Sequence, residues 1–398
     1  MAGSFRVAGL FAGIGGIETG FRRALGDQLE TVLLCESWGP AQQVLEARFP
    51  DVELHGDVAT LRDLPARLDL VAAGFPCTDL SQAGRMAGIR GQESGLVAHL
   101  FEVLRLADDR GDHLPWLLIE NVPNMLALDR GEAMAYLVKE LNKLGYRWAY
   151  RVIDSRFTGV PQRRRRVLLL ASRTEDPRAV LFADDSGGLD EEALHDDAFG
   201  FYWTEGRGGL GWARDATPTF KGGSTVGIPS PPAVWLQDEQ PGRKVVIPCV
   251  EDGEALQGFE RGWTLPADLG RRNGPRWKLV GNAVTVGVAQ WAAERIVSPG
   301  VFDRPSTEWA RKGAWPTAAW GEGEKVWTVD VSEFPRLAPY THLRELLDVD
   351  KARPLSHRAA SGFWRRLQEG NLGRYPGFRA DIAEHVEAAA TDPLSVAV

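Results

Sequence analysis

Residues 7–25 read VAGLFAGIGGIETGFRRAL, and this stretch decides the fold class. An apolar run at residues 7–11 predicts a strand, the glycines that follow predict a tight turn, and Ile17, Phe21 and Leu25 share one face of a helix. Strand-sized apolar runs recur at residues 31–35, 68–73, 116–119, 148–153 and 167–171, with helical patterns between several of them. Such alternation predicts an α/β fold, a doubly wound and mostly parallel sheet that binds ligands beyond the carboxyl ends of its strands.

The chain changes character after this first part, residues 1–171. Residues 172–277 are rich in glycine, acids and aromatic side chains, which predicts a second, small and irregular domain. Residues 278–298 contain a predicted helix at 284–296. Residues 299–398 carry five tryptophans, and exposed indoles would be a liability, so we expect this extension to be folded. These tryptophans are Trp309, Trp315, Trp320, Trp327 and Trp364.

Composition excludes several classes of protein. The 398 residues are 44% hydrophobic and 25% charged, as in ordinary globular proteins, and no apolar run reaches the ~18 residues of a membrane span. The start shows no export signal, and three cysteines without metal-binding spacing favour a reducing cytosol and no metal site. The net charge of −8 argues only weakly against a nucleic-acid partner, because arginines cluster at residues 163–166 and 271–276.

Two acidic residues follow predicted strands and could contact a nucleoside. The glycine turn does not match the dinucleotide pattern GxGxxG, because Glu18 stands where the third glycine belongs. Glu36 follows the second predicted strand and Asp57 follows the next. A carboxylate at the first position suits a ribose diol, and one at the second suits an adenine amino group. Each acid also has a structural interpretation, Asp57 as a helix cap and Glu36 as a solvated loop acid.

A cysteine and a glutamate mark the ends of two further strands. Cys77 follows a buried strand and a proline, in a polar loop with Ser81 and Gln82, and is either a small core residue or a reactive thiol. Glu120 ends the strand at 116–119, where a carboxyl group either donates a proton or caps the next helix.

Four consecutive arginines precede the last strand of the first part. Alternation puts Arg164 and Arg166 on one side of the chain and Arg163 and Arg165 on the other. An arginine cluster is usually a solvated face, but here one pair could face the cleft.

Taken in order, these blocks resemble those of the C5-cytosine DNA methyltransferases over residues 5–297. The matching blocks are Phe11-Ala12-Gly13-Ile14-Gly15-Gly16, Gly74-Phe75-Pro76-Cys77 with Ser81, Glu120-Asn121-Val122, Gln162 with Arg164 and Arg166, Leu256-Gln257-Gly258-Phe259, and Gly281-Asn282-Ala283-Val284. Their order on a doubly wound pattern makes the joint signal specific. The resemblance implies a Rossmann-like methyltransferase that moves a methyl group from S-adenosylmethionine to C5 of a flipped-out cytosine in a specific duplex DNA sequence.

The resemblance also implies a role for each matching residue. Cys77 would attack C6 of the cytosine, Glu120 would contact N3 and the amino group, and Arg166 would hold O2, with Arg164 beside them in the catalytic set. The implied cofactor contacts are Phe11, Gly13, Gly15, Gly16, Glu36, Asp57, Pro76, Asn282 and Val284. The expected DNA contacts are Ser81, Gln82, Arg163, Arg165, Gln257, Arg271, Arg272 and Arg276.

The implied domains are catalytic at residues 1–171 and 278–298 and target-recognising at 172–277. The extension at 299–398 either shares in DNA recognition or serves packing or oligomerisation. Two positions depart from the family's pattern: Gly9, where Asp is frequent, and Thr78, where Gln is usual. The first bears on cofactor affinity, and the second on how the space left by the flipped base is filled.

We expect the chain to bind double-stranded DNA and not to associate with a membrane. We expect a monomer that lies in the cytoplasm at the nucleoid. Whether a cognate restriction endonuclease accompanies it is left open. Two alternatives share the fold: an RNA cytosine-5 methyltransferase, and a catalytically silent DNA-binding regulator, against which the intact set of Cys77, Glu120 and Arg166 argues. A nicotinamide dehydrogenase is disfavoured by the failed glycine pattern.

Overall fold

The computed structural model describes residues 4–75, 95–220, 231–268, 270, 274–311 and 313–391. The chain divides into two units, each built from three separate segments. Unit 1 consists of residues 1–157, 165–188 and 283–337, and unit 2 consists of residues 158–164, 189–282 and 338–398. Residues 299–398, a single extension in the sequence, therefore contribute to both units.

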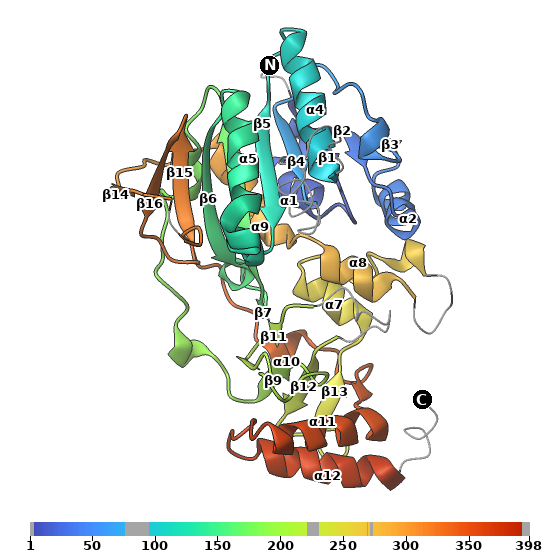
Figure 1. Ribbon diagram of the computed structural model, residues 1–398. Helices are drawn as coiled ribbons and strands as arrows, with labels where there is room; N and C mark the ends of the chain where they lie inside the picture. The colour runs from blue at the N-terminus through green and yellow to red at the C-terminus, as the bar shows by residue number, and fades with distance from the viewer. Residues whose placement is uncertain are drawn as a thin grey trace. The chain divides into compact units, whose positions relative to one another are not determined.

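Unit 1 is built on a large mixed sheet. Among the described residues it has ten strands in the order β14-β16-β15-β6-β8-β5-β4-β1-β2-β3 (Figure 1). The strands are β1 (Phe5–Leu10), β2 (Leu29–Cys35), β3 (Glu53–His55), β4 (Leu70–Ala73), β5 (Trp116–Asn121), β6 (Arg147–Asp154), β8 (Arg165–Ser172), β14 (Ser306–Glu308), β15 (Ala318–Glu322) and β16 (Lys325–Val329). Strands β1 to β5 pair in parallel, whereas β8 runs antiparallel to both β5 and β6. The α/β fold expected from the sequence is confirmed.

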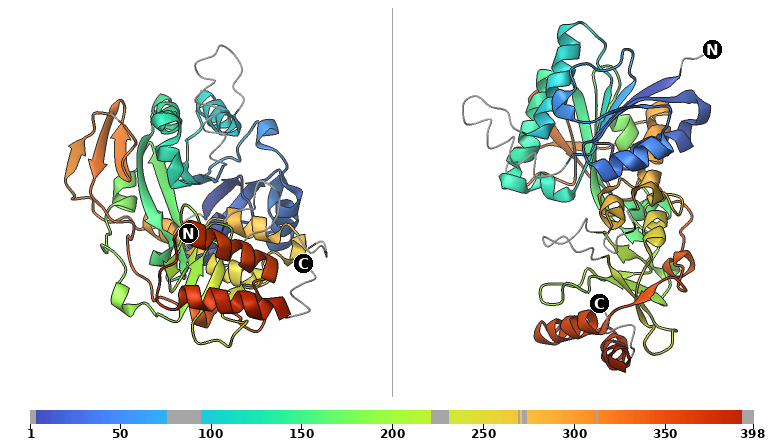
Figure 2. Two further views of the ribbon diagram at one scale, coloured as in Figure 1. Left: turned by 60° about the horizontal axis from the view of Figure 1, so that its bottom comes forward. Right: turned by 90° about the vertical axis from the view of Figure 1, so that its right-hand side faces the viewer.

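Helices cover both faces of this sheet (Figure 2). Leu70 and Ala72 of β4 pack in one apolar core with α1 (Gly16–Leu25), α6 (Pro177–Leu181) and α9 (Val286–Val297). Val71 and Ala73 point to the opposite face and pack in a second core with α4 (Leu96–Asp109) and α5 (Glu132–Lys143). Because successive strand residues alternate between faces, a strand buried on both sides is apolar throughout, as the sequence indicated. Helix α2 (Gly39–Arg48) precedes β3.

Helices α1 and α9 approach closely at a glycine. A Cβ atom on Gly20 would lie 2.5 Å from the Cβ of Ala289 and 2.5 Å from the carbonyl oxygen of Val286. Only a residue without a side chain fits there, so Gly20 sets the distance between the two helices.

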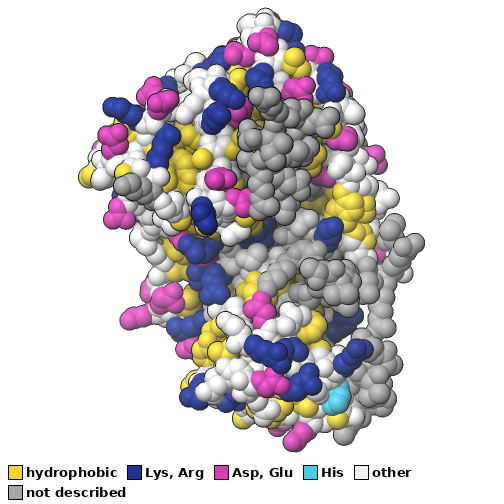
Figure 3. Space-filling view, viewed as in Figure 1, with side chains coloured by type: hydrophobic (Ala, Val, Ile, Leu, Met, Phe, Trp, Pro, Cys, Tyr) yellow, Lys and Arg dark blue, Asp and Glu magenta, His cyan; other side chains and the backbone are white. Residues whose placement is uncertain are grey.

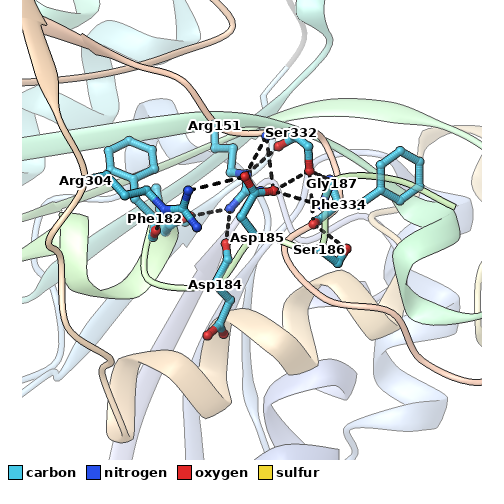
Figure 4. A network of polar contacts seen from close by, with 10 residues as sticks. Arg151, Phe182, Asp184, Asp185, Ser186, Gly187, Arg304, Ser332 and Phe334 are labelled. Atoms are coloured by element: carbon cyan, nitrogen blue, oxygen red, sulfur yellow. Dashed lines mark hydrogen bonds and ion pairs between the residues drawn. The ribbon is translucent and has the colours of Figure 1, made fainter.

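Residues 299–337 complete unit 1 by adding strands to its sheet. Strand β15 pairs antiparallel with β6, and Trp315 packs against Trp148 and Tyr150. A polar network fastens the same segment (Figure 4): Arg151 of β6 is fully buried and donates to the carbonyl oxygen of Ser332 at 2.7 Å. Its Nη2 lies 3.0 Å from Oδ1 of Asp185, which also accepts from the backbone N–H of Ser332.

Unit 2 has its own antiparallel sheet, in the order β10-β9-β12-β13-β17. The strands are β9 (Ala198–Phe201), β10 (Ala213–Arg214), β12 (Ala233–Leu236), β13 (Val245–Ile247) and β17 (Arg353–Pro354). One face packs against α11 (His357–Glu369) and α12 (Phe378–Thr391), and the other against α7 (Val250–Leu256), α8 (Arg276–Asn282) and α10 (Leu343–Leu346). A parallel pair joins β7 (Gln162–Arg163) to β11 (Thr217–Pro218). Residues 338–398 thus provide an edge strand and a full helical layer.

None of the helices in the described ranges is both long enough and apolar enough to span a bilayer.

Candidate active site

Four parallel strands of unit 1 end at one edge of the sheet. The paired residues at this edge are Leu10 with Cys35, Leu10 with Ala73, and Ala73 with Ile119. The residues that follow these strand ends are therefore brought together. A Cβ atom on Gly74 would lie 3.9 Å from Oε2 of Glu120, 3.9 Å from Cγ2 of Val284 and 4.0 Å from the carbonyl oxygen of Phe11. Blocks far apart in the sequence thus meet above Gly74.

The loop after β1 has an unusual backbone. Phe11, Gly13 and Gly15 all have left-handed φ values, of 57°, 58° and 79°. A Cβ atom on Gly15 would overlap the ring of Phe49, whereas one on Gly13 would meet no atom of the described residues within 4 Å. The turn therefore packs tightly on one side and presents bare backbone on the other, directly before Gly16 begins α1. The free N–H groups of a helix start favour an anionic group there.

Glu36 ties the loop after β1 to the loop after β2. Its Oε2 accepts from the backbone N–H of Gly13 at 2.9 Å, and its Oε1 accepts from the backbone N–H of Trp38 at 2.8 Å. Glu36 is therefore fixed rather than a freely solvated loop acid, and each carboxylate oxygen can accept a further hydrogen bond.

Asp57 caps a short helical turn, η2 (Val58–Thr60). Its Oδ1 accepts from the backbone N–H of Ala59 at 2.9 Å, and the residue is exposed. The capping interpretation of Asp57 is therefore confirmed; a cap occupies one oxygen and leaves the other able to bind a ligand.

The loop after β4 begins at a buried anchor. The side-chain amide of Asn121 donates to the carbonyl oxygen of Phe75 at 2.9 Å, and both residues are buried. Sequence reasoning did not single out Asn121 as a site residue, although it follows Glu120 within a matching block. Six expected site residues lie outside the described residues: Pro76, Cys77, Ser81, Gln82, Arg271 and Arg272.

Glu120 and Arg166 form an ion pair between neighbouring strands β5 and β8. The Nε atom of Arg166 lies 2.8 Å from Oε1 of Glu120, and the side chains are only 12% and 9% exposed. Arg166 also donates to the carbonyl oxygen of Arg165 at 2.7 Å. The guanidinium and carboxyl groups that the sequence assigned to one site are therefore in contact and shielded from water.

The other arginines of this cluster differ in burial and in their partners. Arg164 is buried in unit 2 and donates to the carbonyl oxygen of Gly281 at 3.2 Å. Arg165 is exposed, and its Nε donates to Oε2 of Glu333 at 2.8 Å. Arg163 is half-buried and donates to the carbonyl oxygen of Gly211 at 3.1 Å.

Two side chains expected on the DNA surface are instead part of the interior of unit 2. Gln257 is fully buried, and its amide donates to the carbonyl oxygen of Val280 at 3.1 Å. Arg276 is 11% exposed, and its Nη2 lies 2.9 Å from Glu251 and 3.1 Å from Glu254. Burial lowers the pKa of Arg276, but these two acids outweigh it and raise that pKa above its usual value. Both side chains hold α7 to α8, which corrects the expectation that they contact DNA.

The last matching block is divided between the two units. Asn282 ends α8 in unit 2 and is exposed. Val284 belongs to unit 1 and lies half-buried near Gly74. The two expected cofactor contacts therefore have different surroundings.

Comparisons with known proteins assign this arrangement to a class. Residues 5–193 match the family model described as C-5 cytosine-specific DNA methylase. The chain belongs to this family, because it is also 46% identical over 370 residues to the Type II methyltransferase M2.BsuMI of Bacillus subtilis (strain 168), covering 91% of this chain and 92% of that protein. It is therefore a DNA (cytosine-5) methyltransferase.

More distant relatives agree with this assignment. The chain is 25% identical over 312 residues to the Type II methyltransferase M.MspI of Moraxella sp, covering 73% of this chain and 70% of that protein. The S. pombe Dnmt2 methyltransferase structure superposes with a TM-score of 0.54 at 16% identity, covering 74% of this chain and 99% of that one. At this identity the second comparison supports the fold alone.

The methyl donor of such an enzyme is S-adenosylmethionine, and the carboxyl edge of unit 1 fits this cofactor. A Cβ atom on Gly13 would meet nothing within 4 Å in the part of the chain that the structure describes, so the backbone there is accessible to a ligand. Glu36 offers fixed carboxylate oxygens, which suit a ribose diol. Gly74 leaves room between Glu120 and Val284.

Proposed function

We propose that Cys77 is the nucleophile and that Glu120 and Arg166 hold the target cytosine. The Cys77 thiolate would add to C6 of the ring while Glu120 supplies a proton at N3, which makes C5 an electron-rich, enamine-like carbon. S-adenosylmethionine supplies the methyl group that C5 takes up. A base, for which water suffices, then takes the C5 proton, which restores the C5–C6 double bond and expels the Cys77 thiolate, and N3 returns its proton to Glu120. C5 and C6 are stacked in duplex DNA, so the base must be flipped out at a cost of a few kcal/mol.

The observation that carries this proposal is the shielded contact between Arg166 and Glu120, 2.8 Å apart at the carboxyl edge of β5. The guanidinium group of Arg166 can donate to O2 of cytosine, and the carboxyl group of Glu120 can contact N3 and the amino group. Strands of the sheet hold both side chains. Such fixed groups need little reorganisation when charge develops on the ring. Arg164 stands between β7 and β8 in the sequence, and it is buried and donates to the carbonyl oxygen of Gly281. It would therefore support the catalytic set without contacting the base.

For the cofactor, we propose that Phe11, Gly13, Gly15 and Gly16 surround its methionine part and that Glu36 accepts from the ribose hydroxyls. Asp57 would accept from the adenine amino group with the oxygen not used in capping. Pro76, Asn282 and Val284 would complete the site near the transferred methyl group.

Target recognition is the proposed role of unit 2, including residues 338–398 of the extension. Figure 3 shows Lys and Arg side chains gathered over α11. Arg358 and Arg365 of this helix are exposed, Arg365 to 73%. Exposed arginines can bind phosphates or guanine edges. We assign the same role to Arg163 and Arg165, and to Ser81, Gln82, Arg271 and Arg272 near the base.

The biological setting would be a Type II restriction–modification system, as the names of M2.BsuMI and M.MspI say for those proteins. The chain would then methylate double-stranded DNA as a monomer, in the cytoplasm at the nucleoid, alongside a cognate endonuclease.

Replacing Cys77 by Ser tests the chemical step. Cys77→Ser should abolish methyl transfer and leave DNA binding intact. Cys249→Ser is the matched control, because Cys249 caps α7 in unit 2 and is not among the residues proposed to contact the cytosine or the cofactor. A duplex with 5-fluorocytosine at the target should become covalently linked to the wild type and not to Cys77→Ser, since fluorine cannot leave C5 as the proton does. Full activity of Cys77→Ser would refute the mechanism.

The substrate is tested by comparing duplex DNA with transfer RNA. We expect methylation of DNA only, and bisulfite sequencing of DNA from cells that express the chain should show one methylated sequence. Methylation of transfer RNA alone would favour the RNA enzyme.

A further inference from the structure

Three residues of unit 2 that no part of the methylation chemistry uses meet in one cluster. They are His195, Asp215 and His342, and one candidate ligand atom from each lies within 4.8 Å of the others. His195 follows the turn η6 (Glu191–Ala193), Asp215 joins β10 to β11, and His342 precedes α10. The cluster therefore links segments more than a hundred residues apart along the chain.

Asp215 is held in place before any ligand arrives. It is fully buried, and its φ of 47° is in the left-handed region that residues other than glycine rarely adopt. Its Oδ2 accepts from the backbone N–H of His195 at 3.0 Å, and its Oδ1 accepts from the backbone N–H of Leu343 at 2.7 Å. A carboxylate held from two sides presents its oxygens in a fixed position.

The two imidazoles sit beside this carboxylate. Nδ1 of His342 lies 2.6 Å from Oδ2 of Asp215, and the rings of His195 and His342 stack with centroids 3.4 Å apart at 4°. A metal ion binds in the plane of an imidazole, so two parallel rings cannot share one ion as they stand. His195 is exposed, and its ring can turn out of the stack, which also gives an ion a path from solvent.

We propose that unit 2 binds one transition-metal ion of the zinc class through His195, His342 and Asp215. Two imidazole nitrogens and one carboxylate oxygen favour Zn²⁺, Co²⁺ or Ni²⁺ over Mg²⁺ and Ca²⁺, which prefer oxygen alone. Water would complete the coordination. The ion would fasten residues 338–398 to the rest of unit 2, a stabilising role separate from methyl transfer.

Metal titration of the untagged, metal-free full chain tests this proposal. Co²⁺ should give one visible absorption band that saturates at one ion per chain, Zn²⁺ should displace it, and Zn²⁺ should raise Tm by a few degrees. His195→Ala should weaken the binding by at least ~10- to 100-fold, the effect typical of losing even an outer contact of a metal site. Since His195 is exposed, this variant should fold and methylate DNA as the wild type does.

His99→Ala is the matched control. His99 is half-exposed in unit 1 and pairs with Glu102, so its loss should leave the titration unchanged. His342→Ala should weaken Co²⁺ binding at least as much as His195→Ala does. The proposal is overturned if the wild type binds no stoichiometric Co²⁺ or Zn²⁺, or if His195→Ala and His99→Ala bind alike.

Discussion

The carboxyl group of Glu18 lies where a side chain on Gly9 would point. A Cβ atom built on Gly9 would overlap Oε1 of Glu18, which reaches back from the first turn of α1 to β1. Glu18 is 1% exposed, and its Oε2 has no hydrogen-bond partner among the described residues. Members of the family often have Asp at this position. This chain has Gly9 there, and the carboxyl group of Glu18 occupies the space into which a side chain at position 9 would extend.

Replacing Glu18 by Gln should make the protein more stable in alkaline solution. Burial raises the pKa of Glu18 from 4.5 to about 7. The folded state therefore binds the proton more tightly, and the stability that this group contributes is present below pH 4.5 and lost as the pH rises through 7. At pH 8 we expect Glu18→Gln to exceed the wild type by up to roughly 3 kcal/mol, and near pH 4.5 the two should agree. Urea denaturation at several pH values measures this.

The matched control is Glu46→Gln, since Glu46 is exposed on α2. This variant should follow the wild type at each pH. A Glu18→Gln curve parallel to that of the wild type would contradict the assignment.

Because Gly9 and Glu18 share one space, substitutions at these two positions should have non-additive effects on the free energy of unfolding. Gly9→Asp alone would put two carboxyl groups into one buried space, where they repel and overlap. Adding Glu18→Ala empties that space, so the double variant should be more stable than Gly9→Asp alone. A double-mutant cycle from thermal unfolding should give a coupling energy of ~1–3 kcal/mol. Additive effects would show that the two positions do not share the space.

Arg166 and Arg165 are neighbours that should respond differently to the same change. Arg166→Lys keeps the charge but loses the planar guanidinium that faces Glu120, so we expect kcat to fall by ~10²- to 10⁴-fold with DNA binding retained. Arg165→Lys alters an exposed pair with Glu333 and should leave kcat within about threefold. Steady-state kinetics and DNA-binding titrations measure both. Equal losses in the two variants would remove Arg166 from the proposed site.

Asp185 should be essential for the stability of unit 1. Asp185→Asn would leave the fully buried Arg151 without its ion pair, at a cost of ~3–5 kcal/mol, whereas the exposed Asp303→Asn should change stability by less than ~0.5 kcal/mol. Burial alone would raise the pKa of Asp185, but the hydrogen bonds from Ser332 and the charge of Arg151 hold it below its usual value.

The contribution of Asp185 is therefore present above the unfolded pKa of 3.8 and is lost as the pH falls through the lower folded value. Thermal unfolding should show the deficit of Asp185→Asn at pH 7 and a smaller deficit in strong acid. A deficit that is independent of pH would contradict the role of the charge.

The sequence predicted the parts of the fold that depend on local periodicity. The apolar runs became β1, β2, β4, β5, β6 and β8, and the helix expected at 284–296 became α9. The antiparallel direction of β8 was not predictable, because a strand buried on both faces has the same composition in either direction. The addition of residues 299–337 to the sheet depends on long-range pairing with β6, which leaves no periodic signal.

Within the candidate site, the positions of residues at strand ends were predicted better than the partners of long side chains. Glu120 and Arg166 meet because strand register and alternation fix both ends of the contact. Gln257 and Arg276 were expected on a surface, but their polar groups pair inside unit 2, and no pattern of spacing shows where a long side chain finds its partner. Asn121 and Glu18 were missed for the same reason, since their importance comes from a carbonyl group and a glycine distant in the chain.

The way the chain crosses between the units has a consequence for its synthesis. Unit 2 receives β17, α11 and α12 only from residues after 338, whereas β1 to β6 and β8 of unit 1 are made within the first 172 residues. A growing polypeptide can assemble most of the first sheet on the ribosome, but its second hydrophobic core stays incomplete until α11 and α12 have been made. A chain that stops before residue 353 lacks β17, α11 and α12 and should therefore aggregate rather than form a shorter enzyme, and no single cut in the chain separates the two units.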